Sequence, residues 1–153
     1  MLQLDLLDEV GPQSRPAEEE LAGWAEAAWL GAGDAVVSLR IVNSKEIEAL
    51  NSRYRGKNKA TNVLSFPMDL PSELGIPLLG DLVICAEVVA QEAVQQHKTP
   101  SEHWAHMVVH GMLHLQGYDH VDDEQAIEME RLEKRIMKAF GYADPYQDED
   151  KRK

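Results

Sequence analysis

Four stretches of the chain carry the apolar patterns of β-strands. Residues 2–6 alternate leucine with polar residues, and this period of two is typical of a strand with one buried face. The other three are runs rich in apolar and β-branched residues, at 35–42, 61–67 and 78–85. Pro67 is expected to end the third strand, because proline cannot continue a hydrogen-bonded ladder.

Five further stretches repeat their apolar residues every three or four positions, which is the spacing of amphipathic helices. The predicted helices cover 18–30, about 44–54, 86–97, 101–116 and 122–140. Either Asn43 or Ser44 is expected to cap the second helix. Thr99 opens the fourth as a capping box with proline at the first helical position, and Gly117 is placed to end it. The residues of the fifth helix predicted to face inward are Ala126, Met129, Leu132, Ile136 and Phe140.

Strands interleaved with helices over 153 residues predict a single domain, 1–153. Its class is α+β (α/β layered), with a small mixed four-stranded sheet packed with about five helices. Residues 143–153 are predicted to form a flexible tail. No apolar run reaches the roughly 20 residues needed to cross a bilayer, and the N-terminus lacks the basic region of a signal peptide. Cys85 is the only cysteine, so no internal disulfide can form and we expect the cytoplasm.

The charge is unevenly distributed along the chain. The net charge of −12 argues against broad non-specific nucleic-acid binding, because an acidic surface repels phosphate. Between Ala49 and Met68, however, there is no acidic residue, and this stretch contains four basic ones. They are Arg53, Arg55, Lys57 and Lys59. An acidic protein with one basic loop can still bind an anion at that loop.

Four of the six histidines lie in the fifteen residues HMVVHGMLHLQGYDH, from His106 to His120. His106, His110 and His114 recur every four residues and form one stripe on the fourth helix. The first and third are about 12 Å apart along the axis, so all three cannot bind one ion, whereas either adjacent pair can. Gly117 permits a chain reversal that brings His120 back towards the helix end.

The resulting spacing, H-x3-H-x5-H, predicts a zinc ion on His110, His114 and His120. The helix would then be a zincin-like central helix that carries the metal ligands. Three neutral imidazoles leave the fourth zinc position open, as in a catalytic site. The alternative is a buried helix whose histidines are each hydrogen bonded. Gly111 stands where a zinc peptidase has its glutamate base, which disfavours peptide hydrolysis.

Three blocks of the sequence together resemble the YbeY-type endoribonucleases, bacterial metalloproteins of rRNA maturation. They are HMVVHGMLHLQGYDH, YRGKNKATNVLSFP and LLGDLVIC, and with the last helix the resemblance extends over about residues 35–142. It implies zinc on the three histidines, cleavage of single-stranded RNA in 16S rRNA 3′-end processing and ribosome quality control, association with the ribosome, and a functional Arg55. Ala60 departs from the family, in which proline is common at this position.

The resulting hypothesis is a zinc-dependent, single-strand-specific endoribonuclease with rRNA and the ribosome as partners. Binding to membranes or to DNA is not expected. Arg55 and His114 are the predicted catalytic residues, and Arg55, Lys57 and Lys59 the predicted substrate contacts. Two alternatives are a zinc peptidase of metzincin-like geometry and a ribosome-associated factor with a structural metal. His106 is assigned to the core or to a position behind the ligands, and His103 to the periphery.

Overall fold

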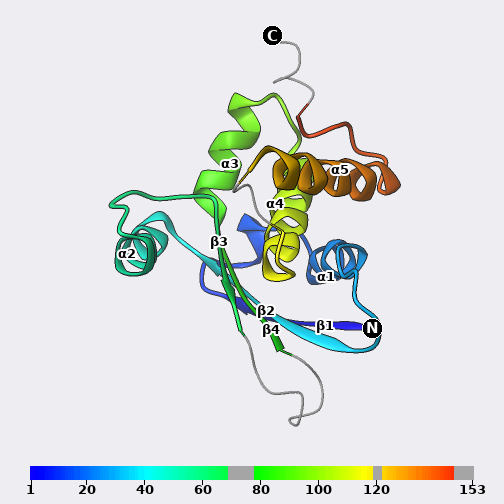
Figure 1. The fold of residues 1–153 in the computed structure, drawn as a ribbon. Helices are drawn as coiled ribbons and strands as arrows, with labels where there is room; N and C mark the ends of the chain where they lie inside the picture. The colour runs from blue at the N-terminus through cyan, green and yellow to red at the C-terminus, as the bar shows by residue number, and fades with distance from the viewer. Residues whose placement is uncertain (69–77, 119–121, 147–153) are drawn as a thin grey trace.

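The computed structural model describes residues 1–68, 78–118 and 122–146. Within them the chain forms four strands and five α-helices, which are interleaved at first and end in three consecutive helices (Figure 1). In order they are β1 (Leu2–Asp8), a 3-10 turn (Pro12–Ser14), α1 (Glu18–Ala27), β2 (Ala35–Val42), α2 (Ser44–Arg55), β3 (Val63–Pro67), β4 (Leu78–Cys85), α3 (Ala86–Gln95), α4 (Pro100–Leu115) and α5 (Asp123–Ala139). Each predicted strand and helix is present.

The strands form one mixed sheet in the order β1-β2-β4-β3. β1, β2 and β4 run parallel, and β3 pairs antiparallel with β4 at the edge. The predicted α+β class with a mixed four-stranded sheet is therefore confirmed. β3 starts at Val63, two residues later than predicted. The antiparallel edge strand matters for function because it forms one wall of the candidate site described below.

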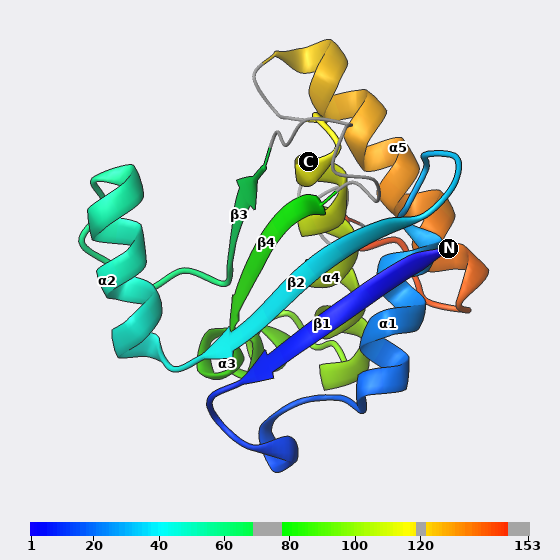
Figure 2. The ribbon, with the colours of Figure 1, turned by 90° about the horizontal axis from the view of Figure 1, so that it is seen from below.

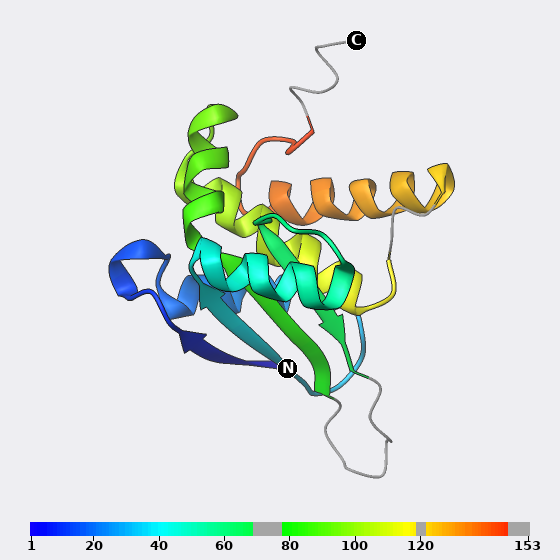
Figure 3. The same ribbon diagram turned by 90° about the vertical axis from the view of Figure 1, so that its left-hand side faces the viewer.

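Helix α4 lies at the centre of the molecule. It packs on β3 and β4 and also contacts α1, α3 and α5, so it is enclosed between the sheet and α5 (Figures 1 and 3). From His103 to Leu115 the helix is buried except at two residues, His110 and His114. The two predicted metal ligands are thus the places where this central helix reaches an accessible surface.

Apolar side chains cover both faces of β4. Leu82 and Ile84 join the main core beneath α4, whereas Val83 and Cys85 pack with Ile47 of α2 on the opposite face. Seen from below, α4 and α5 lie behind the sheet and α2 lies beside β3 (Figure 2). This places the basic C-terminal end of α2 next to the same edge strand that α4 packs against.

Local signals explain where the helices begin and end. The Asn43 side chain accepts a hydrogen bond from the Glu46 amide and caps α2, and Thr99 accepts from the Glu102 amide at the start of α4. α4 ends at Leu115, and Gly117 follows with a φ of 99°, which fits its predicted role as a helix stop. No helix among the described residues is long and apolar enough to cross a membrane.

Two burial predictions are wrong. Phe140 is 41% exposed, because α5 ends at Ala139 and Phe140 lies just beyond it, stacked on Tyr142. His103 is only 2% exposed, and it hydrogen bonds with Glu92 of α3. A helix packed on several sides buries polar positions that face a neighbouring helix, so His103 is an internal residue.

Candidate metal centre and substrate cleft

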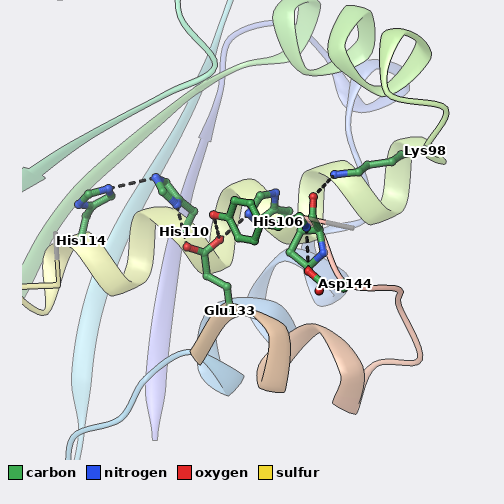
Figure 4. Close-up of polar contacts among 8 residues, drawn as sticks. Lys98, His106, His110, His114, Glu133 and Asp144 are labelled. Atoms are coloured by element: carbon green, nitrogen blue, oxygen red, sulfur yellow. Dashed lines mark hydrogen bonds and ion pairs between the residues drawn. The ribbon is translucent and has the colours of Figure 1, made fainter. Parts of the chain in front are cut away.

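His110 and His114 point towards one another from successive turns of α4 (Figure 4). Their Nε2 atoms are 3.0 Å apart, and their rings are nearly perpendicular, with centroids 4.5 Å apart. Helical spacing of four residues places the two side chains on one face. The pair is therefore held with both Nε2 atoms directed at a common point.

This separation fits two ligands of one zinc ion. Two Zn–N bonds of about 2.0–2.1 Å at a tetrahedral angle hold their nitrogens about 3.3 Å apart. The observed Nε2–Nε2 distance of 3.0 Å is close to that value. Little movement of either ring would be needed for both to bind the same ion.

The two histidines open into a cleft of about 420 Å³ between α4, β3 and the end of α2. Arg55, Ser65 and Tyr118 also line it. Arg55 is the last residue of α2 and is exposed, and the edge strand β3 supplies the opposite wall. Residues separated by more than fifty positions, Arg55 and His110, thus share one cavity, as their predicted roles require.

The remaining predicted site residues are placed as follows. Lys57 and Lys59 are exposed in the loop after α2, beyond the residues that line the cleft. His120, the third predicted ligand, lies outside the described residues. The ligand set of His110, His114 and His120 therefore stays a prediction, of which the structure brings the first two members together.

Behind His110, away from the cleft, lies the fully buried carboxylate of Glu133 on α5. One of its oxygens, Oε1, is 3.2 Å from Nδ1 of His110. The other, Oε2, contacts Nε2 of His106 and accepts a hydrogen bond of 2.8 Å from the hydroxyl of Tyr146. Figure 4 shows the line of contacts running from His114 through His110 to Glu133 and His106.

These contacts determine the protonation states of Glu133 and His106. Burial alone would raise the pKa of Glu133, but hydrogen bonds with His106 and His110 outweigh it and lower that pKa from 4.5 to about 2. Burial lowers the pKa of His106 below its usual 6.5, against the opposing effect of Glu133. At neutral pH the centre therefore contains an ionised carboxylate and a neutral His106.

Comparison with known proteins identifies the family. The family model described as Endoribonuclease YbeY matches residues 16–141, which is most of the chain. The chain belongs to the YbeY endoribonuclease family. The match includes the basic stretch, β3, β4 and the described part of the histidine segment. Membership makes the chain an endoribonuclease, a hydrolase of phosphodiester bonds, and supports a place in rRNA processing.

A solved structure also resembles the chain over nearly its whole length. It is the solution structure of TM1509 from Thermotoga maritima, with 25% sequence identity and a TM-score of 0.57. The alignment covers 95% of this chain and 98% of that one. The arrangement of helices and sheet in this YbeY family member therefore has an experimentally determined counterpart.

A second group in the YbeY family member could also hold a metal ion. His106, His110 and Glu133 each offer a ligand atom within 4.8 Å of the others. In this structure, however, direct hydrogen bonds join these side chains, and Glu133 is fully buried. A metal at His110 thus has two possible sets of partners, and only the set with His114 faces the cleft.

Sequence reasoning missed Glu133 and Tyr146. Glu133 is four residues after Met129 and three before Ile136, so it is in phase with the buried stripe of α5. An acidic residue in phase with an apolar stripe is a signal that could have identified it. Tyr146 falls within the predicted flexible tail of residues 143–153, and nothing in its local sequence marks it as a partner of α5.

Proposed function

We propose that the chain is a zinc-dependent endoribonuclease that cuts single-stranded RNA during rRNA maturation. One observation carries the proposal: Nε2 atoms of His110 and His114 lie 3.0 Å apart in a cleft that Arg55 also lines. The sequence spacing adds His120 as third ligand. The family resemblance supports 16S rRNA 3′-end processing, ribosome quality control, the ribosome as a partner and the cytoplasm as the compartment.

The residues in and beside the cleft have separate proposed roles. His110 and His114, with His120, would hold zinc, which when bound polarises a phosphoryl oxygen and activates a hydroxyl near neutral pH. Arg55 would bind a non-bridging phosphate oxygen pair through its guanidinium and stabilise the charge that grows there. Lys57 and Lys59, on the adjoining loop, would contact the RNA backbone on either side.

The composition of the cleft favours an anionic substrate over a peptide. Among the described residues that line it there is no aspartate or glutamate, so none of these residues is a carboxylate base of the kind that zinc peptidases use. Arg55 gives the same cavity a fixed positive charge. This counts against the peptidase alternative. A ribosome-associated factor with a structural metal would require a closed metal site, whereas His110 and His114 face an open cleft.

Metal analysis combined with RNA cleavage tests the proposal. We expect His114→Ala to lose both bound zinc and cleavage of a single-stranded oligonucleotide. Arg55→Ala should keep its zinc and lose activity on the order of 100-fold, as when one charge-stabilising donor is removed. The matched controls are His97→Ala, an exposed histidine on another segment, and Arg53→Ala, whose guanidinium lies over the Tyr54 ring.

Three results would contradict the proposal. Equal cleavage by wild type and His114→Ala would show that the histidine pair is not part of the nuclease centre. Equal losses in Arg53→Ala and Arg55→Ala would show that the segment acts through general charge and that Arg55 has no special place in the cleft. Turnover of peptides without RNA cleavage would support the peptidase alternative.

A further inference from the structure

We propose that Glu133 and Tyr146 position His110 for metal binding by fixing which of its ring nitrogens carries the proton. The inference rests on the proposed metal site of His110 and His114 and extends it to residues on α5 and the C-terminal segment. Neither Glu133 nor Tyr146 lines the cleft among the described residues. Both therefore act through His110 and are positioning residues.

The geometry determines the tautomer of His110. A carboxylate can only accept hydrogen bonds, so a ring nitrogen that bonds to it must carry the hydrogen. Nδ1 of His110 faces Oε1 of Glu133 at 3.2 Å, which places the proton on Nδ1. In the neutral ring Nε2 then keeps its lone pair, and this is the atom that faces His114 at 3.0 Å. The ligand atom is thus unprotonated before a metal arrives.

The same carboxylate is itself held from two other sides. His106 Nε2 and the Tyr146 hydroxyl both bond to Oε2, which leaves Oε1 to His110. The His106 and Tyr146 rings also pack edge-to-face, with centroids 5.4 Å apart. Rotation of the Glu133 carboxylate would break these contacts, so its orientation towards His110 is fixed by His106 and Tyr146 together.

Tyr146 reaches Glu133 because the chain after α5 is anchored along its path. The Lys98 ammonium donates to the carbonyl of Pro145 at 3.1 Å, and Lys134 forms an ion pair of 3.5 Å with Asp144. The backbone amide of Tyr146 donates to the Asp144 side chain. The first part of the predicted tail thus supports the metal centre from behind.

Helix α4 contains an internal control for this arrangement. His103 Nε2 bonds to Glu92 at 2.8 Å, and His103 is as buried as His106. In this second histidine–carboxylate pair the carboxylate comes from α3, and it also accepts a hydrogen bond from the Asn62 amide. Removing the Glu92 carboxylate should therefore disturb a buried pair on the same helix without changing the His110 tautomer.

The test compares four variants with wild type in two measurements. Zinc affinity is measured by competition with a chromophoric chelator, and the His110 tautomer by nitrogen-15 NMR of the metal-free protein. Glu133→Met, which removes both acceptors at similar volume, should weaken zinc binding about 10–100-fold and release His110 from the Nδ1–H form. Glu133→Gln and Tyr146→Phe should weaken it less, and Glu92→Gln should leave both measurements within twofold of wild type.

Each outcome decides the inference. Wild-type zinc affinity and tautomer in Tyr146→Phe and in folded Glu133→Gln would overturn it, as would an equal loss in Glu92→Gln. Tyr146→Phe keeps the ring and removes one hydroxyl, so it tests the idea even if the Glu133 variants fail to fold. The NMR measurement needs neither zinc nor RNA. Absence of RNA cleavage by wild type would therefore refute the proposed function without affecting the His110 result.

Discussion

Replacing Gly111 with alanine should destabilise the protein, although the same change usually strengthens a helix. A Cβ atom at Gly111 would lie 2.7 Å from Cδ2 of Leu82 and 3.4 Å from Ser65 Oγ. Leu82 is completely buried in β4, so its methyl group has little space into which it can move. Gly111 therefore marks a close approach of α4 to the sheet.

A second helical glycine allows the size of this effect to be worked out. At Gly23, an exposed position of α1, a Cβ would meet no atom within 4 Å, so alanine should stabilise the fold by about 0.5–1 kcal/mol. At Gly111 the same gain is opposed by overpacking of about 1–3 kcal/mol. The expected net loss for Gly111→Ala is about 0–2.5 kcal/mol, and the difference between the two variants is about 1–3 kcal/mol.

Urea unfolding of both variants and wild type, followed by circular dichroism, measures this difference directly. For a chain of this length, each 1 kcal/mol should also move the thermal midpoint by about 2–4 °C. We expect Gly23→Ala to shift upward and Gly111→Ala to shift downward or stay level. If Gly111→Ala were as stabilising as Gly23→Ala, the close contact with Leu82 would not constrain the helix and the reasoning would be wrong.

Three further predictions concern the periphery, the basic loop and the core. Hydrogen bonds to Asp8 from Arg15 and two backbone amides outweigh burial and lower the pKa of Asp8 below 3.8. The ionised Asp8 therefore stabilises the folded protein fully above pH 3.8, and this contribution is lost as the pH falls through the pKa of the folded state. Asp8→Asn should thus destabilise at pH 7, and its difference from wild type in urea unfolding should shrink below pH 4; a difference that does not depend on pH would contradict this. If Lys57 and Lys59 contact RNA phosphates, each alanine variant should reduce the slope of log K against log salt by about 0.7, measured by fluorescence anisotropy; unchanged slopes would remove them from the interface. Cys85 is 0% exposed, so a thiol reagent should react with it only on unfolding, and fast labelling of the native protein would contradict its burial.

Much of the fold could be predicted from the sequence because the periodic patterns are local. β2 and β4 begin and end as predicted, since their apolar runs are bounded by clear turn and helix signals. β3 was predicted two residues too long, because a strand end depends on its partner. At that end the Cys85 amide donates to the carbonyl of Asn62, outside the β3 strand. The order of the strands depends on non-local contacts and could not be derived from periodicity.

The residues of the candidate site differ in how far the sequence alone could predict their roles. Spacing along one helix limited the ligand pair to His106 with His110 or His110 with His114, because the rise and turn of an α-helix are fixed. The glycine turn and His120 after the helix then favoured His110 with His114. Arg55 could be connected to them only through charge contrast and family resemblance, since the cavity they share joins α2 to α4. Glu133 and Tyr146 were missed because their role depends on how α5 and the following chain pack behind α4.

Gly111 connects the packing of α4 to the chemistry of the cleft. From sequence, the glycine indicates that the glutamate base of a zinc peptidase is missing. In the structure, the direction of its absent side chain is already filled by Leu82, Ser65 and Val63 of the sheet. A glutamate there would require Leu82 or α4 itself to shift, and a shift of α4 would move His110 relative to Arg55. The tight contact that disfavours a carboxylate at position 111 thus involves Ser65 and Val63 of β3, which also line the cleft, and a cleft without that carboxylate suits a phosphodiester better than a peptide.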